Sequence, residues 1–328
     1  MFKLIWTVAL VLLGVTTAVA APSAQRMAPM GLAEREALQH LMKKQGCCTI
    51  TRNASYNISG APGTKIMFQN GNDEDFAKLA DVESLRILFM SDFGGRNLTS
   101  ACQETLPKLK NLEILVVSFL KKQDVTLTVD LSSLGQLKQL TVKGCTISSQ
   151  TMESLGKLEN LEILTLNGNT YPAPESTGGS EVVKEPFRTI GKLHNLTYLF
   201  VEYSPEITGD DLKYLSPEQL PNLESILLCH IEGGDAALLH LAQFQSLQSI
   251  RMDNANLTDA GLLAFSQTPE TVLPKLTHVG MEGNPGITNE GVRALMGRFN
   301  LKSMTVRGTG VTPVLRRELR NARVQVYR

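Results

Sequence analysis

One ten-residue segment, Asn160 to Asn169, limits what this chain can fold into more than any other. It reads Asn-Leu-Glu-Ile-Leu-Thr-Leu-Asn-Gly-Asn. If Leu161 is position 1 of a repeating unit, leucines stand at positions 1, 4 and 6 and asparagine stands at position 9. Alternation along a short strand turns positions 4 and 6 to one face and positions 3, 5 and 7 to the other. One such segment cannot bury its own apolar face, so the pattern predicts similar neighbours.

The same pattern recurs in one register along the chain. Successive position-1 leucines are 24 to 29 residues apart, except for a step of 35 residues from Leu161 to Leu196. Units of this length predict a stack of strand-and-turn repeats around one core. Ile66 and Phe68 are consistent with a further, degenerate strand. The position-1 leucines are Leu85, Leu112, Leu137, Leu161, Leu196, Leu223, Leu247, Leu276 and Leu301.

The segments between the strands predict short helices. Thr208, Thr258 and Thr288 each begin a Thr-x-x-[Gly/Asp]-[Leu/Val] motif. Threonine can cap the start of a helix, and an acidic residue in the first turn favours the helix dipole. Outer segments of this kind predict a strongly curved arc. Residues 313–328, with a helix over Pro313–Asn321 and a last strand through Val324 and Val326, are expected to close the stack.

Three segments precede the repeats. Residues 1–20 read as a signal peptide, because Lys3 is followed by the apolar run Leu4–Val15 and by Ala18-Val19-Ala20. Residues 21–30 are expected to form a flexible mature N-terminus.

Residues 31–62 are expected to form an N-terminal cap. Leu32, Leu38, Leu41 and Met42 recur at helical spacing over 32–44, and a strand through Cys48 and Ile50 follows. A cap covers the end of the apolar stack, as a solenoid requires. The solenoid itself is expected over 63–328, with an inserted loop at 171–185 that is rich in Pro, Gly, Ser and Glu. Both a tolerated insertion and a functional lid stay open for this loop.

The repeats resemble the leucine-rich repeat superfamily over roughly residues 63–320. The Asn-Leu-x-x-Leu strands and the Leu-Thr-Asp-Ala-Gly-Leu turn at 257–262 are similar to the ribonuclease-inhibitor-like and cysteine-containing subtypes, and to exported bacterial proteins of this class. The resemblance implies an α/β fold: a right-handed horseshoe solenoid, with a parallel sheet on the concave face and short helices on the convex face, used for binding. Position 9 departs from the pattern, because it is asparagine only at Asn169 and Asn284.

Composition restricts the partners and the compartment. The formal net charge is zero and no long basic run occurs, so nucleic acid is not expected as a partner. No stretch after the signal is long and apolar enough for a membrane span. The chain is therefore expected to be secreted, periplasmic or extracellular, and monomeric or weakly associated.

The five cysteines do not form a disulfide framework, because their number is odd and their spacing irregular. Pairing among Cys47, Cys48 and Cys102 stays open. Cys145 stands at position 9, where a small buried side chain can replace asparagine, so a structural role is expected for it.

Large apolar side chains stand at positions 3 and 5 of the earlier repeats, on the concave face. We hypothesise that they form a docking surface for a protein or peptide. Two alternatives stay open: β-propensity alone favours these residue types, and the cap or the 171–185 loop could fold over them. The residues are Ile87, Phe89, Ile114, Val116, Ile163, Tyr198, Phe200 and Leu227.

The sequence contains little that supports a metal site or a catalytic site. Asp253 and Glu282 stand in one row on neighbouring strands and are weak candidates for a shared cation such as Ca²⁺. The alternative is that they pair with Arg251 and Arg307. Cys229, His278 and Asp253 form the nearest approach to a catalytic group, without the motifs that accompany known hydrolases.

The expected function is non-catalytic recognition of a protein, peptide or surface glycan through the concave face, without a cofactor. Two other classes stay open: an envelope-associated protein whose repeats pack against like chains, and a hydrolase inhibitor or enzyme. Of the glycosylation sequons, Asn195 belongs to the repeat pattern itself, whereas Asn53 and Asn57 are plausible acceptors in a eukaryotic source.

Overall fold

The computed structural model describes residues 30–44, 46–54, 63–92, 100–119, 125–171, 185–269 and 273–327. The expected signal peptide at 1–20, nearly all of the flexible terminus at 21–30 and most of the inserted loop at 171–185 lie outside the described residues.

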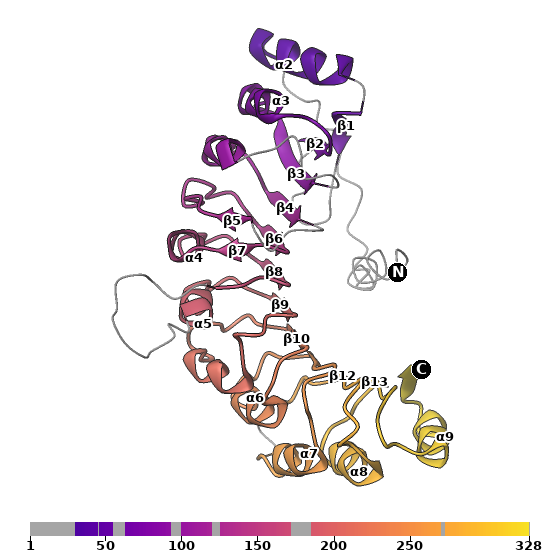
Figure 1. Cartoon of the computed structure of the whole chain (residues 1–328). Helices are drawn as coiled ribbons and strands as arrows, with labels where there is room; N and C mark the ends of the chain where they lie inside the picture. Colours follow the sequence, from indigo (N-terminus) through magenta and orange to yellow (C-terminus); the bar gives the residue numbers. More distant parts are fainter. Residues whose placement is uncertain are drawn as a thin grey trace.

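The predicted repeats stack into one sheet, and their register is the predicted one. In the described part the sheet has 12 strands, which pair in parallel except for the first two. The strands line the inner side of an arc and the helices its outer side (Figure 1). The position-4 residues face one another along the ladder: Leu88, Leu115, Leu140, Leu164, Leu199, Ile226, Ile250, Val279 and Met304.

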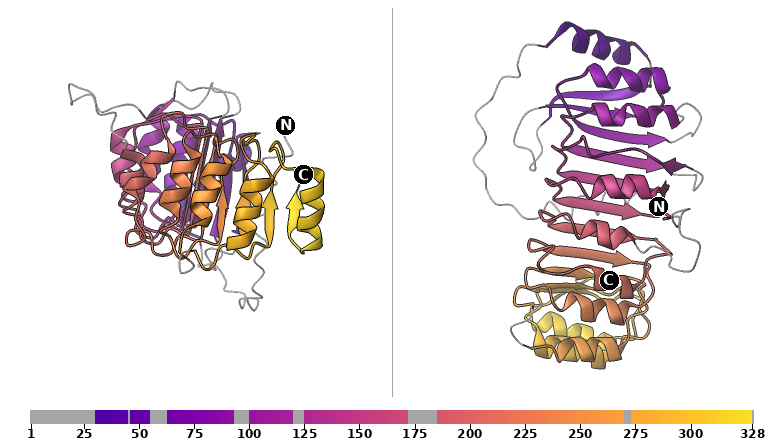
Figure 2. Two further views of the ribbon diagram at one scale, coloured as in Figure 1. Left: turned by 90° about the horizontal axis from the view of Figure 1, so that it is seen from below. Right: turned by 90° about the vertical axis from the view of Figure 1, so that its left-hand side faces the viewer.

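The strands of the sheet follow chain order, with a separate short pair beside it. The pair consists of β5 (Thr126–Leu127) and β7 (Thr146–Ile147). Figure 2 shows the main strands side by side from one end of the arc to the other. These strands are β1 (Cys48–Ala54), β2 (Gly63–Phe68), β3 (Leu85–Asp92), β4 (Ile114–Phe119), β6 (Gln139–Lys143), β8 (Ile163–Asn167), β9 (Tyr198–Glu202), β10 (Ser225–Cys229), β11 (Ser249–Arg251), β12 (His278–Gly280), β13 (Ser303–Thr305) and β14 (Gln325–Tyr327).

The outer segments are short helices of two kinds. The α-helices are α2 (Leu32–Lys43), α3 (Asp73–Ala77), α4 (Ser149–Leu155), α5 (Glu185–Ile190), α6 (Gly234–Leu241), α7 (Asp259–Ser266), α8 (Asn289–Arg298) and α9 (Pro313–Asn321). The 3₁₀ helices are η2 (Lys78–Asp81), η3 (Ser100–Glu104), η4 (Leu106–Lys108) and η5 (Gly209–Tyr214).

The curvature is concentrated where the outer segments are longest. The stack is nearly straight up to β10 and bends most beside α6, α7, α8 and α9 (Figure 1). An α-helix with its side chains is about 10 Å wide, whereas neighbouring strands lie about 4.8 Å apart, so consecutive helices spread the outer side. The expected strong curvature therefore belongs to the C-terminal half.

One expected helix has a different geometry. The motif at Thr208 forms the 3₁₀ helix η5, whereas those at Thr258 and Thr288 start α7 and α8. Pro217 lies shortly after η5 and disfavours helical conformation at the residue before it. Pro217 therefore limits how far this helix can extend at its C-terminal end.

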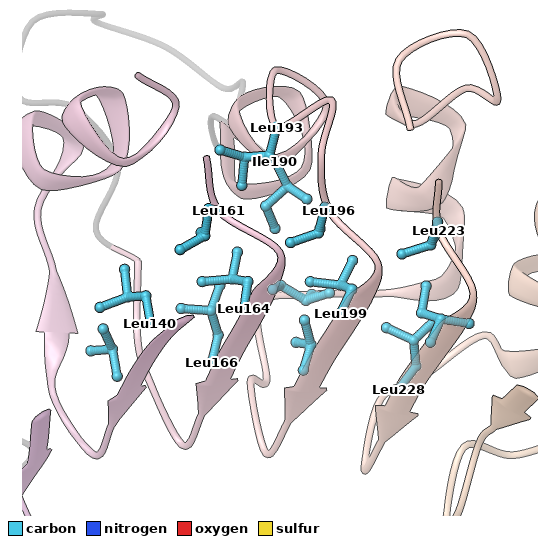
Figure 3. Close-up of a cluster of buried hydrophobic side chains, with 14 of the residues drawn as sticks. Leu140, Leu161, Leu164, Leu166, Ile190, Leu193, Leu196, Leu199, Leu223 and Leu228 are labelled. Atoms are coloured by element: carbon cyan, nitrogen blue, oxygen red, sulfur yellow. The ribbon is translucent and has the colours of Figure 1, made fainter. Parts of the chain in front are cut away.

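Leucines from every repeat form one continuous core. Each position-1 leucine is at most 4% exposed, and the core cluster extends from Ala37 to Val324. In the central repeats Leu164, Leu166 and Leu199 from the strands meet Ile190 and Leu193 from the outer segment (Figure 3). Full burial of such a side chain contributes about 1.5–3 kcal/mol.

Buried asparagines at position 9 bond the backbone where one repeat turns beside the next. The Asn284 Oδ1 accepts hydrogen bonds from the N–H groups of Ala255 (2.9 Å) and Leu257 (3.0 Å), and its Nδ2 donates to the Met252 carbonyl (2.9 Å). Asn169 bonds Cys145 and Val142 of the preceding repeat in the same way. These side chains satisfy backbone groups that water cannot reach.

A second polar ladder links the starts of the outer helices. The Asp235 carboxylate accepts from the Thr258 N–H (2.9 Å) and hydroxyl (2.6 Å), and Asp259 accepts from the Thr288 N–H (2.8 Å) and the Gly291 N–H (3.0 Å). The carboxylate in the first turn of one helix thus bonds the N-terminus of the following helix. From the sequence, this carboxylate was expected to act only on the dipole of its own helix.

Helix α2 lies at the N-terminal end of the stack. Its buried residues are Glu34, Ala37, Leu38 and Leu41, which lie on one helical face. Leu32 and Met42, expected on the same face, are 68% and 71% exposed because they fall outside this i, i+3, i+4, i+7 set.

Polar contacts attach α2 to the first repeats. The buried Glu34 carboxylate accepts from the Ser84 N–H (3.2 Å) and from its hydroxyl. The buried Asp75 carboxylate bonds Lys44, His40 (2.9 Å) and the Asn72 N–H (2.9 Å). The end of the core is therefore covered by a helix that is fixed through charged groups.

The Asp–Thr ladder predicts that a small residue is required at Gly261. A Cβ at Gly261 would overlap the Asp235 carboxylate, whereas a Cβ at Gly297 in α8 would meet nothing within 4 Å. Gly261→Ala should lower the free energy of unfolding by about 1–3 kcal/mol, despite the better helix propensity of alanine. Gly297→Ala should raise it by up to about 1 kcal/mol. Urea unfolding of both variants checks this, and equal effects would contradict the ladder.

The contacts of Asp75 predict a loss of stability in acid. Burial raises the pKa of Asp75, but the hydrogen bonds from Lys44, Asn72 and His40 outweigh it and hold the pKa below the ordinary 3.8. A lowered folded-state pKa gives stability that is present above the unfolded pKa and is lost as the pH falls through the folded pKa.

Asp75→Asn should therefore lower Tm at pH 7, with the difference from wild type narrowing below about pH 4. Glu74→Gln, at an exposed position of the same helix α3, is the control and should change Tm little. Thermal melts from pH 2 to 7 measure both. A difference that stays constant with pH would show that charge on Asp75 is not what attaches α2.

Candidate functional site

Part of the expected concave surface forms a compact apolar cluster. Phe200, Leu227 and Cys229 pack together, with Ile163 and Tyr198 partly buried against them, and this group is separate from the main core. Tyr198 and Phe200 lie two residues apart on the same face of β9, with ring centroids 6.3 Å apart. Phe200 faces Leu227 on the neighbouring strand β10. We call these five residues the concave apolar cluster. Cys229, at position 7, was not among the residues expected here.

The other four expected residues lie at a distance from this cluster. Ile87 and Phe89 on β3 face Ile114 and Val116 on β4. The concave positions of β6, between the two groups, are Gln139, Thr141 and Lys143. The predicted continuous apolar stripe is therefore divided by a polar strand.

The side chains of the expected docking residues are also less exposed to solvent than the docking hypothesis supposed. Ile87 and Ile114 are 1% and 2% exposed, and Phe200 and Leu227 are 7% and 8% exposed. Phe89, Val116, Ile163 and Tyr198 are half-buried, and the Lys65 ammonium lies 4.8 Å from the Phe89 ring centroid. Ile87 faces Ile114 and Phe200 faces Leu227 on neighbouring strands, so each side chain covers part of its partner.

The carboxylates considered for a cation are held by arginines. The Asp253 carboxylate accepts from Arg251 Nε (2.5 Å) and from the Glu282 N–H (2.9 Å). Glu282 pairs with Arg307 at 3.0 Å. Among the described residues no group of three or more His, Cys, Asp or Glu side chains is arranged to hold a metal ion. Asp253 and Glu282 therefore form ion pairs with arginines, which was the alternative to a cation site.

The Cys229, His278 and Asp253 side chains do not form a nucleophile–base pair. Burial raises the pKa of the Cys229 thiol well above its ordinary value. His278 Nδ1 bonds the Thr277 hydroxyl (2.8 Å), and the Asp253 carboxylate is engaged by Arg251. A thiol needs a lowered pKa to act as a nucleophile, so this site lacks the first requirement.

Glu202 is bonded differently from the other acids of its row. It stands at position 7 of β9, and its carboxylate accepts one hydrogen bond from Asn167 Nδ2 (2.5 Å). Burial raises the pKa of Glu202, although Arg251, Lys143 and His230 oppose this at longer range. Within the described chain no Lys, Arg or His nitrogen lies within ion-pair distance of it.

Position 8 forms a row that the sequence analysis missed. From Gly144 to Gly308 every position 8 has positive φ, including the non-glycine residues Tyr203 (51°), His230 (57°) and Asn254 (52°). The rings of Tyr203 and His230 stack with centroids 3.9 Å apart. Glycine at position 8 of four repeats was the available signal, because the left-handed region favours glycine.

The cysteines are all free, so the pairing left open among Cys47, Cys48 and Cys102 does not form. Cys145 is buried at position 9, and its Sγ donates to Asn169 Oδ1 (3.7 Å). This contact agrees with the structural role expected for Cys145. Burial raises the pKa of Cys48 and of Cys145 to about 12.

The asparagine that precedes each position-1 leucine also has a structural role. Asn111, Asn160, Asn195 and Asn222 donate to backbone carbonyls of the preceding repeat at 2.7–3.2 Å. The amide of Asn195 is thus used by the repeat itself, as its sequence context predicted. Asn57 and the side chain of Asn53 lie outside the described residues.

The raised thiol pKa values predict slow alkylation in the folded state. At pH 8 a thiol of pKa about 12 is ionised to about one part in ten thousand, and the thiolate is the nucleophile. Iodoacetamide should therefore leave Cys145 and Cys48 unlabelled in the folded chain and label both in urea, as measured by mass spectrometry of peptides. Rapid labelling of Cys145 in the folded chain would contradict its burial.

Comparisons with known proteins give matches among solved structures alone. No family model matches the chain, and no curated protein matches it. Among solved structures, an internalin of Listeria monocytogenes is similar at 16% identity and a TM-score of 0.46, over 76% of this chain and 69% of that one. A leucine-rich repeat protein of Leptospira interrogans is similar at 15% identity and a TM-score of 0.35, over 77% and 80%.

Among the described residues no helix combines the length and apolar character that a membrane crossing requires. Leucines in one register, parallel strands paired in that register and turn asparagines all agree with the resemblance drawn from the sequence. The chain has the leucine-rich repeat fold.

Proposed function

We propose that this chain is a non-catalytic binding module that takes a protein or peptide ligand on its concave face. One observation carries the proposal: the concave apolar cluster lies across the sheet from the main core. The described helices lie on the outer side of the arc or at its ends (Figures 1 and 2). Apolar side chains on a face that the fold itself does not need are the kind that recognition uses.

The surroundings of the cluster fit an interface. Its centre contains two aromatic rings, Tyr198 and Phe200, and Leu227. Lys143, Glu202 and Arg251 stand around this centre. Protein interfaces combine an apolar, often aromatic centre with a polar rim, and the centre supplies most of the binding energy. An apolar centre favours a protein or peptide over a glycan, which would present mainly hydroxyl groups.

Of the expected docking residues, we assign the centre of binding to Ile163, Tyr198, Phe200 and Leu227. Ile87 and Ile114 are too deeply buried to contribute contact area. The self-packing alternative would use the same cluster between like chains. Light scattering over a range of protein concentrations separates the two, because only self-packing makes the mass rise with concentration.

We further propose that the chain acts after export. The support is the sequence at its start: Lys3, the apolar run Leu4–Val15 and the Ala18-Val19-Ala20 motif. Fractionation of producing cells with an antibody against the chain tests this. Chain that retains residues 1–20 and stays in the cytoplasm would contradict the proposal.

A matched pair of substitutions tests the binding face. Phe200 and Phe89 both stand at position 5 on the concave face, but only Phe200 belongs to the concave apolar cluster. Phe200→Ser should weaken capture of the ligand at least about tenfold, as loss of a central aromatic does. Phe89→Ser should leave capture nearly unchanged. Capture by the immobilised chain, read by mass spectrometry, measures both.

Thermal melts accompany the capture, so that unfolding is not mistaken for loss of contact. Equal capture by wild type and Phe200→Ser, with both folded, would refute the proposal.

A further inference from the structure

A row of three non-glycine residues extends along one edge of the concave face. Tyr203, His230 and Asn254 occupy left-handed position 8 on consecutive repeats, where Gly144, Gly168, Gly283 and Gly308 occupy the others. A non-glycine residue in this region is strained by about 1–2 kcal/mol, and such strain gathers at functional sites. Tyr203 is also 54% exposed, so the fold gains little burial from its ring.

One face of the Tyr203 ring is covered and the other is open. His230 stacks on the side of the following repeat, at 3.9 Å between centroids. On the opposite side the preceding repeat carries Gly168, and a Cβ built there would meet no heavy atom within 4 Å beyond its chain neighbours. Gly168 therefore leaves open space, rather than a side chain, at position 8 on this side of Tyr203.

Glu202 borders this space. It precedes Tyr203 in the chain, and the hydrogen bond from Asn167 Nδ2 draws its carboxylate toward the repeat that carries Gly168. Asp253 and Glu282, the other acids of its row, are each paired with an arginine of this chain. Glu202 has one hydrogen bond from a neutral amide and, among the described residues, no ion pair. Glu202 is half-buried, and neither of its carboxylate oxygens is among the buried atoms without a partner, so the second oxygen is accessible to a ligand.

We propose that Glu202 and the open face of Tyr203 receive an arginine side chain of the bound protein or peptide. The inference rests on the function proposed above and names the chemistry of its ligand. A guanidinium is planar, stacks on an aromatic face and donates two parallel hydrogen bonds to a carboxylate. In this chain Asp253 pairs with Arg251 and Glu282 pairs with Arg307. The ligand arginine would be the corresponding partner of Glu202.

The adjacent cluster extends this recognition to a second ligand side chain. Phe200 and Glu202 lie on the same face of β9, two residues apart, which corresponds to about 6–7 Å. The ligand should therefore present an apolar side chain within this distance of its arginine. Lysine fits less well, because an ammonium group neither stacks as a plane nor binds a carboxylate through two parallel bonds.

Peptide selection tests the proposal. A displayed library of random linear peptides is selected on the purified full chain, and the strongest peptide is titrated by calorimetry. Arginine near an apolar residue should be enriched. Replacement of that arginine by citrulline, which keeps the shape and removes the charge, should weaken binding roughly tenfold or more.

Variants of the chain locate the contact. Glu202→Gln should weaken binding of the arginine peptide to a similar extent. It should not further weaken binding of the citrulline peptide. Glu282→Gln, at the row position already paired with Arg307, is the matched control and should bind as wild type does. Tyr203→Gly should also weaken binding while its Tm is kept or raised, because glycine relieves the left-handed strain.

The outcomes separate this inference from the function on which it rests. The selected peptides could require Phe200 for binding, contain no excess of arginine and bind equally well to Glu202→Gln. That result would overturn the arginine site but would still support the binding function. Binding to a printed glycan array that depends on Tyr203, without any peptide binding, would overturn both. Failure to select any peptide or glycan would likewise count against both.

Discussion

Stacking of strands in a common register is the constraint on which the rest of this structure depends. No single repeat has enough apolar surface to fold alone, because its leucines point into space that only the neighbouring repeats can fill. Once position 4 of one strand faces position 4 of the next, positions 1 and 6 also meet their counterparts and the outer segment closes the core from the other side. A slip of one residue would turn every one of these side chains to the opposite face, so the register is strongly specified.

Polar groups then define how neighbouring repeats fit together. Asn169 and Asn284 bond backbone groups at the turns, and the asparagines that precede the position-1 leucines bond carbonyls on the opposite side of the repeat. Asp235 and Asp259 connect the outer helices in the same direction along the stack. Each of these contacts joins a repeat to its neighbour, so the interfaces carry hydrogen bonds as well as apolar contacts. At the N-terminal end Glu34 and Asp75 extend this principle to α2.

Much of the fold could be predicted from sequence because leucine spacing reports burial directly: position 1 is buried in every repeat, and the strands occur where the pattern placed them. The Asn–Leu step and the Cys145 site followed from the same register. What escaped prediction depends on pairs of residues far apart in sequence. The carboxylate of Asp235 meets the N-terminus of α7, and Ile87 loses its exposure although its position faces the concave side. For the candidate site, the register gave the residue types, including the polar ones on β6, but not how deeply Ile87, Ile114, Phe200 and Leu227 are buried. The glycines at position 8 were a sequence signal for the left-handed row, but backbone angles were needed to show that Tyr203 and His230 share this conformation.

That row has a consequence for how such a surface can change. Position 8 lies outside the core and outside the ladder of leucines, and its backbone conformation persists whether the residue is glycine, asparagine, histidine or tyrosine. The space around the position differs between repeats: a Cβ at Gly168 would meet nothing within 4 Å, whereas a Cβ at Gly144 would overlap the carbonyl oxygen of Phe119 in the neighbouring repeat. Single residues can therefore be exchanged where this edge is open, at Gly168 and at the positions of Tyr203, His230 and Asn254, on a scaffold that stays the same, whereas Gly144 is fixed by its close neighbour.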